Sequence, residues 1–239
     1  MKVISWNLNG LEDEGLDMRT EAAMFHMLLG APLETAMIKG FKPDMPDVVM
    51  LQEVVPRTFH AHIVPHLKRA GFHIFPDKPS ERSYFEIIAT RQPILEAYYT
   101  PFEYSDQGRG LTTLNIDGLT LMTAHMESQK PGKPMRLAQA KAIIEQMTTC
   151  NTACLFAGDT NLRKKEWQSL ETSAIKDAWE AAGSPKRHKT TWENKPYKAR
   201  YDRAWLKGKD VSGFTTFGRE TVKGLQMRPS DHFAIRVEI

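Results

Sequence analysis

Acidic, amide and imidazole side chains stand in this sequence where short apolar runs begin or end. Asp159 and Asn161 follow the run ACLFAG, and Asp231 and His232 precede the run FAIRVEI. A carboxylate binds cations or accepts a proton, an amide donates or accepts hydrogen bonds, and an imidazole titrates near neutral pH. Together these residue types are suited to hydrolysis at a site that also holds a metal ion.

Such residues occur at or near the ends of six predicted strands. They are Asn7 after residues 2–6, Glu53 after 47–52, His125 and Ser128 after 119–124, Asp159 and Asn161 after 152–158, Asp202 within 200–206, and Asp231 and His232 before 233–239. If the strands lie side by side, these ends converge on one rim of the fold.

Each of these residues also has a simpler interpretation. An asparagine or aspartate after a strand usually forms a turn. Glu53 could cap a helix that follows it, and a lone histidine is more often a surface or core residue than a catalytic one. These interpretations would have to hold independently at all six segments, so the co-occurrence favours a shared site.

The chemistry that fits is metal-assisted hydrolysis of a phosphoester. Mg²⁺ prefers oxygen ligands and is commonly bound by one or two carboxylates. Glu53 can supply the carboxylate, and Asn7 can supply a neutral oxygen. A metal ion offsets charge on a phosphate oxygen as phosphorus becomes five-coordinate.

The remaining residues can act on water and on the phosphate. Asp159 can orient and deprotonate an attacking water, and Asn161 can donate to phosphoryl oxygens. His125 and His232 can donate to the non-bridging oxygens or carry protons, and Asp202 is the candidate that fixes the tautomer of His232. No glycine-rich phosphate loop and no His/Cys zinc spacing competes with this interpretation.

Short strands recur along the chain, with helices between some of them and hairpins between others. The clearest hairpin lies at residues 111–126, where alternating runs flank Asp117-Gly118. Further strands are predicted at 84–90 and 212–217, and helices at 11–45, 57–70 (with an internal Pro65), 134–149 and near 173–182. The mixture predicts an α/β fold in which sheets pack together under helices.

The composition is that of an ordinary globular chain. Of 239 residues 41% are hydrophobic and 26% charged, which argues against disorder and favours a single domain over residues 1–239. The net charge of +3 permits a polyanionic partner without demanding one. We expect a monomer with no membrane partner.

Cysteine usage and the N-terminal residues bear on location. Cys150 and Cys154 offer neither a disulfide framework nor a zinc site. No apolar run approaches the length of a transmembrane helix, and the first residues lack the apolar stretch of a signal peptide. The sequence therefore predicts an intracellular protein, cytoplasmic or nuclear.

Six short motifs resemble those of the endonuclease/exonuclease/phosphatase superfamily. They are SWNLNG, LQEV, TAHMES, FAGDTN, RYDRAW and SDHF, in that order, and the likeness runs from residue 2 to residue 239. Each motif alone is weakly specific, but all six in order are strongly specific. Within the superfamily the chain is most similar to the 5′-tyrosyl-DNA phosphodiesterases, through FAGDTNLR, LMTAHMES and the Arg-aromatic-Asp-Arg pattern of RYDRAW.

The resemblance implies a fold, a cofactor and a reaction. The fold would be a four-layered α/β sandwich with the site at one end of two packed mixed sheets. The cofactor would be Mg²⁺, or Mn²⁺ in its place. The reaction would be hydrolysis of the bond between a DNA 5′-phosphate and the tyrosine of a trapped topoisomerase. It would leave a 5′-phosphate on the DNA and so serve DNA repair. The partner would be a DNA 5′ end that carries a phosphotyrosyl peptide.

The resemblance also implies roles for individual residues. Glu53, Asn7 and Asp231 would bind the metal, and Asp159 and Asn161 would position water and phosphate. His125, Ser128 and His232 would contact the phosphoryl group. Arg163 would contact the DNA backbone.

A single-stranded DNA end would need a basic groove and stacking surfaces. The candidates are Arg109, Arg163, Trp192 and Tyr84. Core packing is an equal alternative for Trp192, and a solvated surface position is the alternative for Arg163. The basic run KRHK at 186–189 is interpreted as an exposed loop.

Some features of the sequence leave other functions open. The motif WNLNG has Asn9 where the tyrosyl-DNA enzymes tend to have aspartate, which favours an abasic-site endonuclease or 3′ exonuclease of the same superfamily. HMES and Asp202-Arg203 oppose that alternative, and the segment 25–46 is longer than expected for the tyrosyl-DNA enzymes. A non-catalytic nucleic-acid-binding module is a further alternative, but the complete polar set argues against it.

Overall fold

Alternate side chains of the N-terminal strand β1 (Lys2–Asn7) point into two different cores. Val3 packs in a core between two sheets, whereas Ile4 and Trp6 pack beneath helices on the opposite face. Successive side chains of a strand point to opposite faces, so a sheet whose strands are apolar on both faces has to be covered on both.

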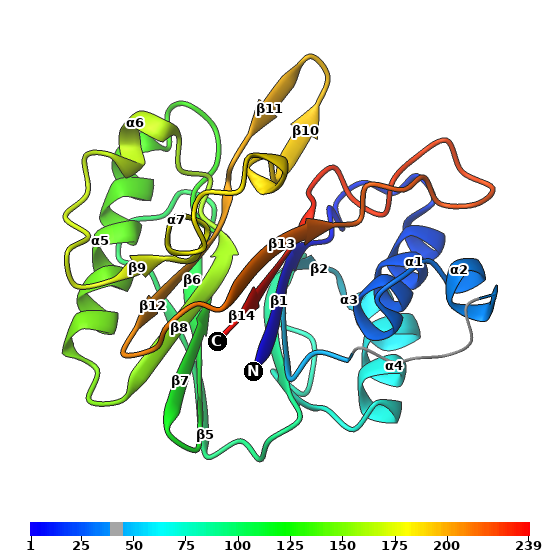
Figure 1. Cartoon of the computed structure of the whole chain (residues 1–239), viewed down its shortest axis with the longest axis horizontal. Helices are drawn as coiled ribbons and strands as arrows, with labels where there is room; N and C mark the ends of the chain where they lie inside the picture. Colours follow the sequence, from blue (N-terminus) through cyan, green and yellow to red (C-terminus); the bar gives the residue numbers. More distant parts are fainter. Residues whose placement is uncertain (39–44) are drawn as a thin grey trace.

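Two six-stranded mixed sheets lie face to face and carry helices on their outer sides (Figure 1). The computed structural model describes residues 1–38 and 45–239, and in them it confirms the predicted four-layered α/β sandwich. The predicted helical segment 11–45 falls partly outside the described residues, since residues 39–44 are not among them.

The first sheet contains both ends of the described chain. Its order is β13 (Gly213–Phe217), β14 (Ala234–Glu238), β1, β2 (Val48–Val54), β4 (Phe85–Thr90) and β3 (His73–Phe75). Strand β1 is parallel to β2 and antiparallel to β14. The residues that follow β1 and β2 in the chain therefore leave the same edge of this sheet.

The second sheet is built around the predicted hairpin. Its order is β5 (Glu96–Pro101), β6 (Gly110–Ile116), β7 (Leu119–Thr123), β8 (Ala153–Asp159), β12 (Asp202–Lys207) and β9 (Lys176–Asp177). Strands β6 and β7 join at Asp117-Gly118, where Gly118 has the positive φ of 70° that such a turn needs. Strand β7 is parallel to β8, so this sheet also has a parallel pair ending at one edge.

Helices cover the outer face of each sheet. Over the first sheet lie α1 (Leu16–Leu29), α2 (Leu33–Ile38), α3 (Pro56–Thr58), a π-helix (Phe59–Ile63) and α4 (Val64–Arg69). Over the second lie α5 (Lys133–Thr149) and α6 (Lys164–Trp167), while α7 (Ala178–Ala181) follows β9. None of the described helices is long and apolar enough to span a membrane.

Three apolar clusters fill the spaces between these layers. The cluster between the sheets includes Val3, Met50, Ile88, Leu121 and Leu155, which come from strands of both sheets. A second cluster lies between the first sheet and its helices, and a third between the second sheet and α5 with α6. The two sheets are therefore held at a fixed separation by side chains of both.

The predicted helix at 57–70 contains a π-helical turn just before Pro65. The backbone N–H of Val64 donates to the carbonyl of Phe59, five residues earlier. Proline has no N–H to continue the ordinary ladder, and a change of hydrogen-bond step accommodates it without ending the helix.

Other predicted boundaries were less accurate. The predicted helix near 173–182 is wrong in extent, because Lys176 and Asp177 pair with β12 and only Ala178–Ala181 are helical. The side chain of Asp177 accepts hydrogen bonds from the backbone N–H groups of Trp179 and Glu180, so it caps a short helix. Elements absent from the prediction are β3, β5, α6, a 3₁₀ turn (Lys186–His188) and the hairpin of β10 (Trp192–Asn194) and β11 (Tyr197–Ala199).

Candidate active site

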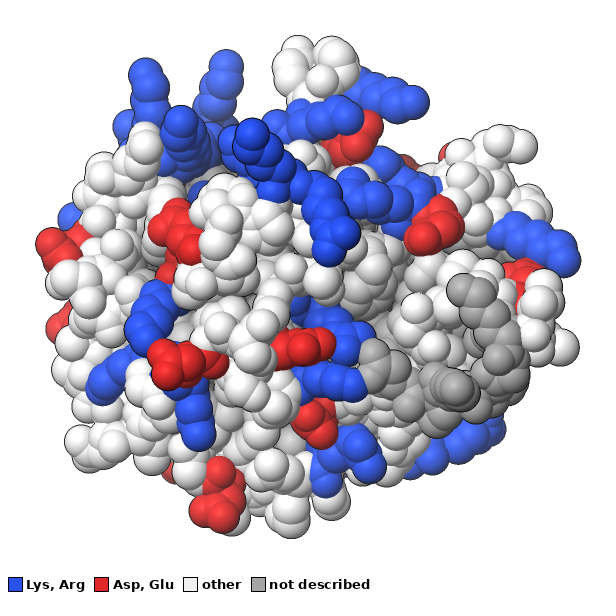
Figure 2. Space-filling view, in the orientation of Figure 1, with Lys and Arg blue, Asp and Glu red and all other residues white. Residues whose placement is uncertain are grey.

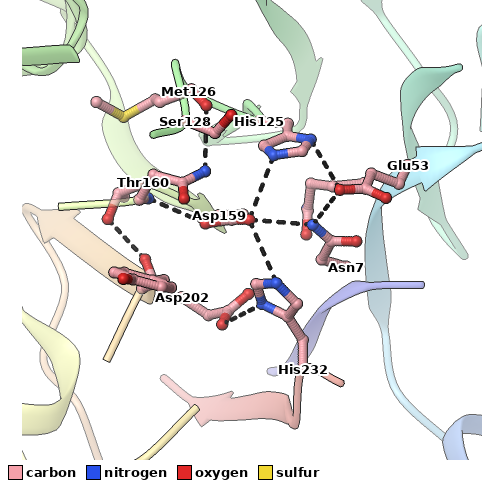
Figure 3. A network of polar contacts seen from close by, with 12 residues as sticks. Asn7, Glu53, His125, Met126, Ser128, Asp159, Thr160, Asp202 and His232 are labelled. Carbon is pink, nitrogen blue, oxygen red and sulfur yellow. Dashed lines mark hydrogen bonds and ion pairs between the residues drawn. The ribbon is translucent and has the colours of Figure 1, made fainter. Parts of the chain in front are cut away.

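Oδ2 of Asp159 is the point at which side chains of both sheets meet (Figure 3). Nδ2 of Asn7 donates to it at 3.0 Å, Nε2 of His125 lies 3.4 Å away, and Nε2 of His232 lies 3.7 Å away. Asn7 ends β1, and His232 stands just before β14, so both belong to the first sheet. Asp159 ends β8 of the second sheet and forms an isolated parallel bridge with His125.

A β-bulge brings Glu53 to the same point. The register of β2 against β4 shifts between Leu51 and Val54, and Glu53 has a left-handed φ of 53°. A bulge redirects the side chain that it carries, and a left-handed non-glycine residue persists only where its surroundings hold it. Nδ2 of Asn7 donates to Oε1 of Glu53 at 3.1 Å. One amide group therefore joins Glu53 to Asp159.

Asn7 acts in this structure as a hydrogen-bond donor to two carboxylates. Its side-chain oxygen, predicted as a metal ligand, accepts a hydrogen bond of 2.9 Å from the backbone N–H of Asn9. Burial raises the pKa of Glu53 above its ordinary value, although the hydrogen bond from Asn7 opposes this shift. A carboxylate with a raised pKa at this position gains from a nearby cation.

Arg109 fixes the tautomer of His125. A guanidinium only donates, and Nη1 of Arg109 lies 2.8 Å from Nδ1 of His125. Nδ1 is therefore the acceptor, and the ring proton resides on Nε2, which faces Asp159. Burial, and then the charge of Arg109, lower the pKa of His125 well below its ordinary value. His125 is thus a neutral donor at physiological pH.

His232 has the opposite electrostatic state. Its Nδ1 lies 2.9 Å from Oδ2 of Asp202, and its Nε2 faces Asp159. Burial alone would lower the pKa of His232, but the charges of Asp202 and then Asp159 raise it to about 10. His232 is therefore an imidazolium that hydrogen-bonds Asp202 through Nδ1 and forms a longer ion pair with Asp159 through Nε2.

Asp159 is buried and titrates above its usual range. Burial, with a further contribution from the charge of Asp202, raises the pKa of Asp159 to about 6, although His232 opposes the shift. Its Oδ1 accepts a hydrogen bond of 2.9 Å from the backbone N–H of Asn161, which has a left-handed φ of 52°. The amide nitrogen of Asn161 donates to the carbonyl of Met126 at 3.2 Å.

Gly158 allows β7 and β8 to come close beside this site. A Cβ at position 158 would lie 2.3 Å from the carbonyl oxygen of Ala124, which is too close for any side chain. Ala124 and Gly158 directly precede His125 and Asp159. The glycine of the FAGDTN motif therefore sets the approach of these two catalytic candidates.

Asp231 is held by Trp192. Nε1 of Trp192, on β10, donates to Oδ2 of Asp231 at 2.8 Å, and the indole packs at a tilt against Tyr201 with the ring centroids 5.3 Å apart. Trp192 is half-buried, so it is neither a fully buried core residue nor an exposed surface residue. Its place beside Asp231 was not predicted.

The other predicted substrate-binding residues lie around this centre. The Tyr84 ring stands over the guanidinium of Arg109, 5.0 Å from centroid to Cζ, and its centroid is 6.1 Å from that of His125. Ser128 is half-buried, and its hydroxyl bonds to Gln107 at 3.0 Å. Arg163 is half-buried and donates to the carbonyl of Asn161 at 2.7 Å, so it is not free in solvent.

Ser230 supports the site and was missed as an individual residue. Its hydroxyl donates to the carbonyl of Asn7 at 2.7 Å and accepts from the backbone N–H of His232 at 3.0 Å. It is the first residue of the SDH motif, so the motif itself carried the signal. The contact between Arg109 and His125 was also missed, because nothing in the spacing of 16 residues predicts it.

The carboxylates of this centre could bind a divalent cation. Ligand atoms of Asp159, Asp202 and His232 lie within 4.8 Å of one another, so this group could hold a metal ion. Both nitrogens of His232, however, already face carboxylates, Nδ1 at 2.9 Å from Asp202 and Nε2 at 3.7 Å from Asp159. Oδ1 of Asp202 is buried and lacks a hydrogen-bond partner among the described residues. Glu53 belongs to the same acidic group, since the charges of Asp159 and Asp231 oppose its ionisation. Carboxylate oxygens are thus the ligands that fit, and they suit a hard cation.

A cleft of about 550 Å³ opens beside Asp231. The hairpin β10–β11, the segment after β1 and the segment before β14 line it, with Asn9, Lys195 and Arg228 among the lining residues. Figure 2 shows lysine and arginine side chains gathered along the upper rim of this face, where β10, β11 and α6 lie in Figure 1. The surroundings of the site are thus basic although its centre is acidic.

A profile of the endonuclease/exonuclease/phosphatase family matches residues 4–232. A Caenorhabditis elegans protein named 5′-tyrosyl-DNA phosphodiesterase is 32% identical over 256 residues, which cover 98% of this chain and 66% of that protein. The human protein named tyrosyl-DNA phosphodiesterase 2 is 27% identical over 258 residues, which cover 98% of this chain and 66% of that protein. The chain therefore spans just under two thirds of the length of these relatives.

Solved structures show the same likeness. The C. elegans structure titled TDP2 has a TM-score of 0.80 and 28% identity, over 99% of this chain and 74% of that chain. The structure of D. rerio TDP2 with a single-strand DNA product has a TM-score of 0.79 and 26% identity, over 99% of this chain and 97% of that chain.

Proposed function

The chain belongs to the endonuclease/exonuclease/phosphatase family, and we propose that it hydrolyses the 5′-phosphotyrosyl bond between DNA and a trapped topoisomerase tyrosine. The products are a DNA 5′-phosphate and a tyrosine-containing peptide. The names of its relatives support this choice of substrate. Because the chain spans only part of those relatives, the activity is proposed here from the site itself.

The observation that carries the proposal is the convergence of an amide and two imidazoles on Asp159 Oδ2. Asn7, His125 and His232 reach that oxygen from both sheets, within 3.0 to 3.7 Å. A carboxylate in such a ring of donors can hold a water molecule and accept its proton, while the donors face the place where phosphoryl oxygens would lie.

The proposed cofactor is Mg²⁺, and Mn²⁺ can replace it. Glu53 and Asp231 would hold it, with Asn7 keeping Glu53 in place through its amide. The mutual repulsion of these carboxylates supports a divalent cation, since the charges of Asp159 and Asp231 both contribute to the raised pKa of Glu53. When bound, Mg²⁺ would offset charge on the phosphate.

Asp159 and the histidines have complementary roles in the proposed reaction. Asp159 accepts the proton of the attacking water, whose oxygen forms the new bond to phosphorus. His125, neutral with its proton on Nε2, and the imidazolium His232 donate to the non-bridging oxygens. Asp202 holds His232 in its protonated form throughout. The bond from phosphorus to the phenolic oxygen then breaks.

The leaving group is a phenolate, which needs little help from an acid. A tyrosine hydroxyl has a pKa of about 10, far below that of an alcohol, so the departing oxygen carries its charge readily. Arg109 and Tyr84 stand together beside His125 and are proposed to receive the tyrosine. Ser128, Asn161 and Arg163 are proposed to contact the 5′-phosphate and the strand behind it.

The DNA strand is proposed to follow the basic rim above the site. That rim supplies the positive charge that a single strand requires, and Trp192 on β10 offers an aromatic surface nearby. We also propose that the protein is a monomer that works inside the cell, in the cytoplasm or nucleus, where such adducts would arise.

Two labelled oligonucleotides test the function. One carries a 5′-phosphotyrosine and the other an internal abasic site, and both are incubated with Mg²⁺ beside the Asp159→Ala protein. Release of tyrosine by the wild type alone, without incision of the abasic strand, is the expected result. Incision of the abasic strand alone would replace the proposal with an abasic-site endonuclease. Inactivity of folded protein on both substrates would favour a non-DNA phosphodiester as substrate, or a binding role.

A further inference from the structure

Arg19, on helix α1, is almost completely buried, with 1% of its surface exposed. All five N–H groups of its guanidinium have backbone carbonyl partners. Nε donates to Glu14, Nη1 to Leu8 at 3.4 Å and Pro229 at 3.1 Å, and Nη2 to Asn9 and Glu12. A guanidinium presents its donors in a rigid planar fork, so these five carbonyls are held in one fixed arrangement.

The carbonyls belong to two segments that lie far apart in the sequence and both adjoin residues of the site. Residues 8–14 follow Asn7, and Pro229 lies two residues before Asp231. Leu8 also donates its backbone N–H to the carbonyl of Gln52 at 3.1 Å, next to Glu53. Arg19 therefore connects the side of the site that carries Asn7 and Glu53 to the side that carries Asp231.

A second buried arginine provides a contrast on the other sheet. Arg136 of α5 binds the carbonyls of Glu127, Ser128 and Gln129, and also forms a two-pronged ion pair with Glu166 at 2.8 and 3.0 Å. Among the described residues, no carboxylate forms such a pair with Arg19. Arg136 thus holds residues 127–129, which follow His125, whereas Arg19 holds the segments that directly follow Asn7 and precede Asp231.

We propose that Arg19 is a positioning residue that fixes the metal-binding carboxylates Glu53 and Asp231 relative to each other, and so sets the affinity for the divalent cation. This inference rests on the proposed function, which assigns the cation to those carboxylates. A small hard cation tolerates little variation in the spacing of its oxygen ligands. Groups that orient metal ligands typically change metal affinity by about 10- to 100-fold when altered.

The first experiment measures Mg²⁺ binding by calorimetry in the absence of substrate. Arg19→Lys keeps the positive charge but replaces the planar fork by three rotatable donors. The expected result is a Kd for Mg²⁺ raised about tenfold or more. Arg136→Lys is the matched control and should bind Mg²⁺ within about twofold of the wild type. Equal affinity of Arg19→Lys and wild type would overturn the inference.

Activity then separates positioning of the metal site from general damage. For Arg19→Lys, the Mg²⁺ concentration for half-maximal rate should rise, while the substrate KM at saturating Mg²⁺ stays unchanged. A raised KM with an unchanged Mg²⁺ requirement would contradict the proposed role. Glu53→Gln separates failure of the proposed function from failure of the role of Arg19. If Glu53→Gln binds Mg²⁺ like the wild type, the metal assignment of the proposed function fails. If it binds Mg²⁺ more weakly, that assignment stands and only the role of Arg19 is in question.

A measurement on the wild type decides the matter if Arg19→Lys does not fold. Amide hydrogen exchange is followed with and without Mg²⁺. Mg²⁺ should slow exchange both in residues 8–14 and in residues 227–232, because Arg19 joins the two segments. Slower exchange near Asp231 with no change in residues 8–14 would overturn the inference.

Discussion

Oδ2 of Asp202 lies 2.9 Å from Nδ1 of His232, and this buried contact joins the two sheets. Asp202 begins β12 of the second sheet, and His232 stands two residues before β14 of the first. The contact keeps His232 protonated and oriented toward Asp159. It therefore sets the charge of the site as well as its geometry.

Replacing Asp202 by asparagine should lower the upper pH limit at which the enzyme is active. Without that carboxylate the pKa of His232 falls from about 10, so the imidazolium is lost at a lower pH. We expect kcat/KM at pH 8 to fall by about 10- to 100-fold, and the descending limb to move to lower pH. A pH–rate profile measures both the loss of kcat/KM and the shift of the alkaline limb. An unchanged alkaline limb would show that protonated His232 is not required.

Replacing Asp159 by asparagine should abolish activity yet stabilise the protein. The raised pKa of about 6 means that the folded state disfavours the ionised carboxylate, so stability is lost as pH rises from about 4 through 6. The variant lacks this cost, so its free energy of unfolding should be about 1–3 kcal/mol higher than that of the wild type at pH 8 in EDTA. Its rate of hydrolysis should fall by about 10²-fold or more.

Urea unfolding at pH 4 and pH 8 tests the stability effect. The difference in free energy of unfolding between variant and wild type should be larger at pH 8, where the wild-type carboxylate is ionised in both the folded and the unfolded state. A variant that is less stable than the wild type at pH 8 would mean that the charge of Asp159 is favourable in the fold.

Chelation of divalent cations should stop the reaction. EDTA should reduce turnover to background, and addition of Mg²⁺ in excess should restore it, because the carboxylates need a cation to approach a phosphate. Glu53→Gln should require more Mg²⁺ for half-maximal rate than the wild type. Undiminished turnover in EDTA would reject a metal-assisted mechanism.

Gly158→Ala should reduce both stability and activity. The added Cβ would lie 2.3 Å from the carbonyl of Ala124, so β7 and β8 must move apart just before His125 and Asp159. We expect a loss of about 1–3 kcal/mol in the free energy of unfolding, together with a lower kcat. Gly213→Ala is the matched control, since its Cβ would meet no atom closer than 3.4 Å. Equal losses of stability in the two variants would contradict the close approach of Gly158 to Ala124.

Cys150 should be the reactive cysteine of the folded protein. Burial opposes ionisation, but hydrogen bonds from Thr120 and Thr152 outweigh it and lower the pKa of Cys150 to about 7, whereas burial raises that of Cys154 to about 12. The rate of alkylation by iodoacetamide should rise with pH through about 7 and then level off, because the thiolate reacts. Cys150→Ser should abolish labelling of native protein; rapid labelling of Cys154 would refute this.

Much of the fold followed from local patterns. The runs before Glu53 and Asp159 are apolar on both faces, so they had to be buried strands, and Asp117-Gly118 fixed a hairpin whatever surrounded it. The candidate site followed from a different signal, which was the repetition of polar residues at strand ends. That signal gave the residues, and the sheet topology then gave their common position.

Other features depend on contacts between distant segments and leave little local trace. Nothing around Arg109 indicates that it binds His125, and nothing around Trp192 indicates that it holds Asp231. The short strands β3, β9, β10 and β11 have two or three residues each, too few to show a period. Asn7 was predicted from its type as an oxygen ligand, but orientation of its amide depends on Glu53, Asp159 and Asn9 together.

The site straddles the boundary between the two sheets, and this has a consequence for residues that never touch it. Asn7, Glu53 and His232 move with one sheet, whereas His125, Asp159 and Asp202 move with the other. The apolar cluster between the sheets sets the distance across which Asn7 and His232 of the first sheet must reach Asp159 of the second. Changing the thickness of that cluster, for example at Ile88 or Leu121, would alter the chemistry from the interior of the molecule without changing any catalytic group.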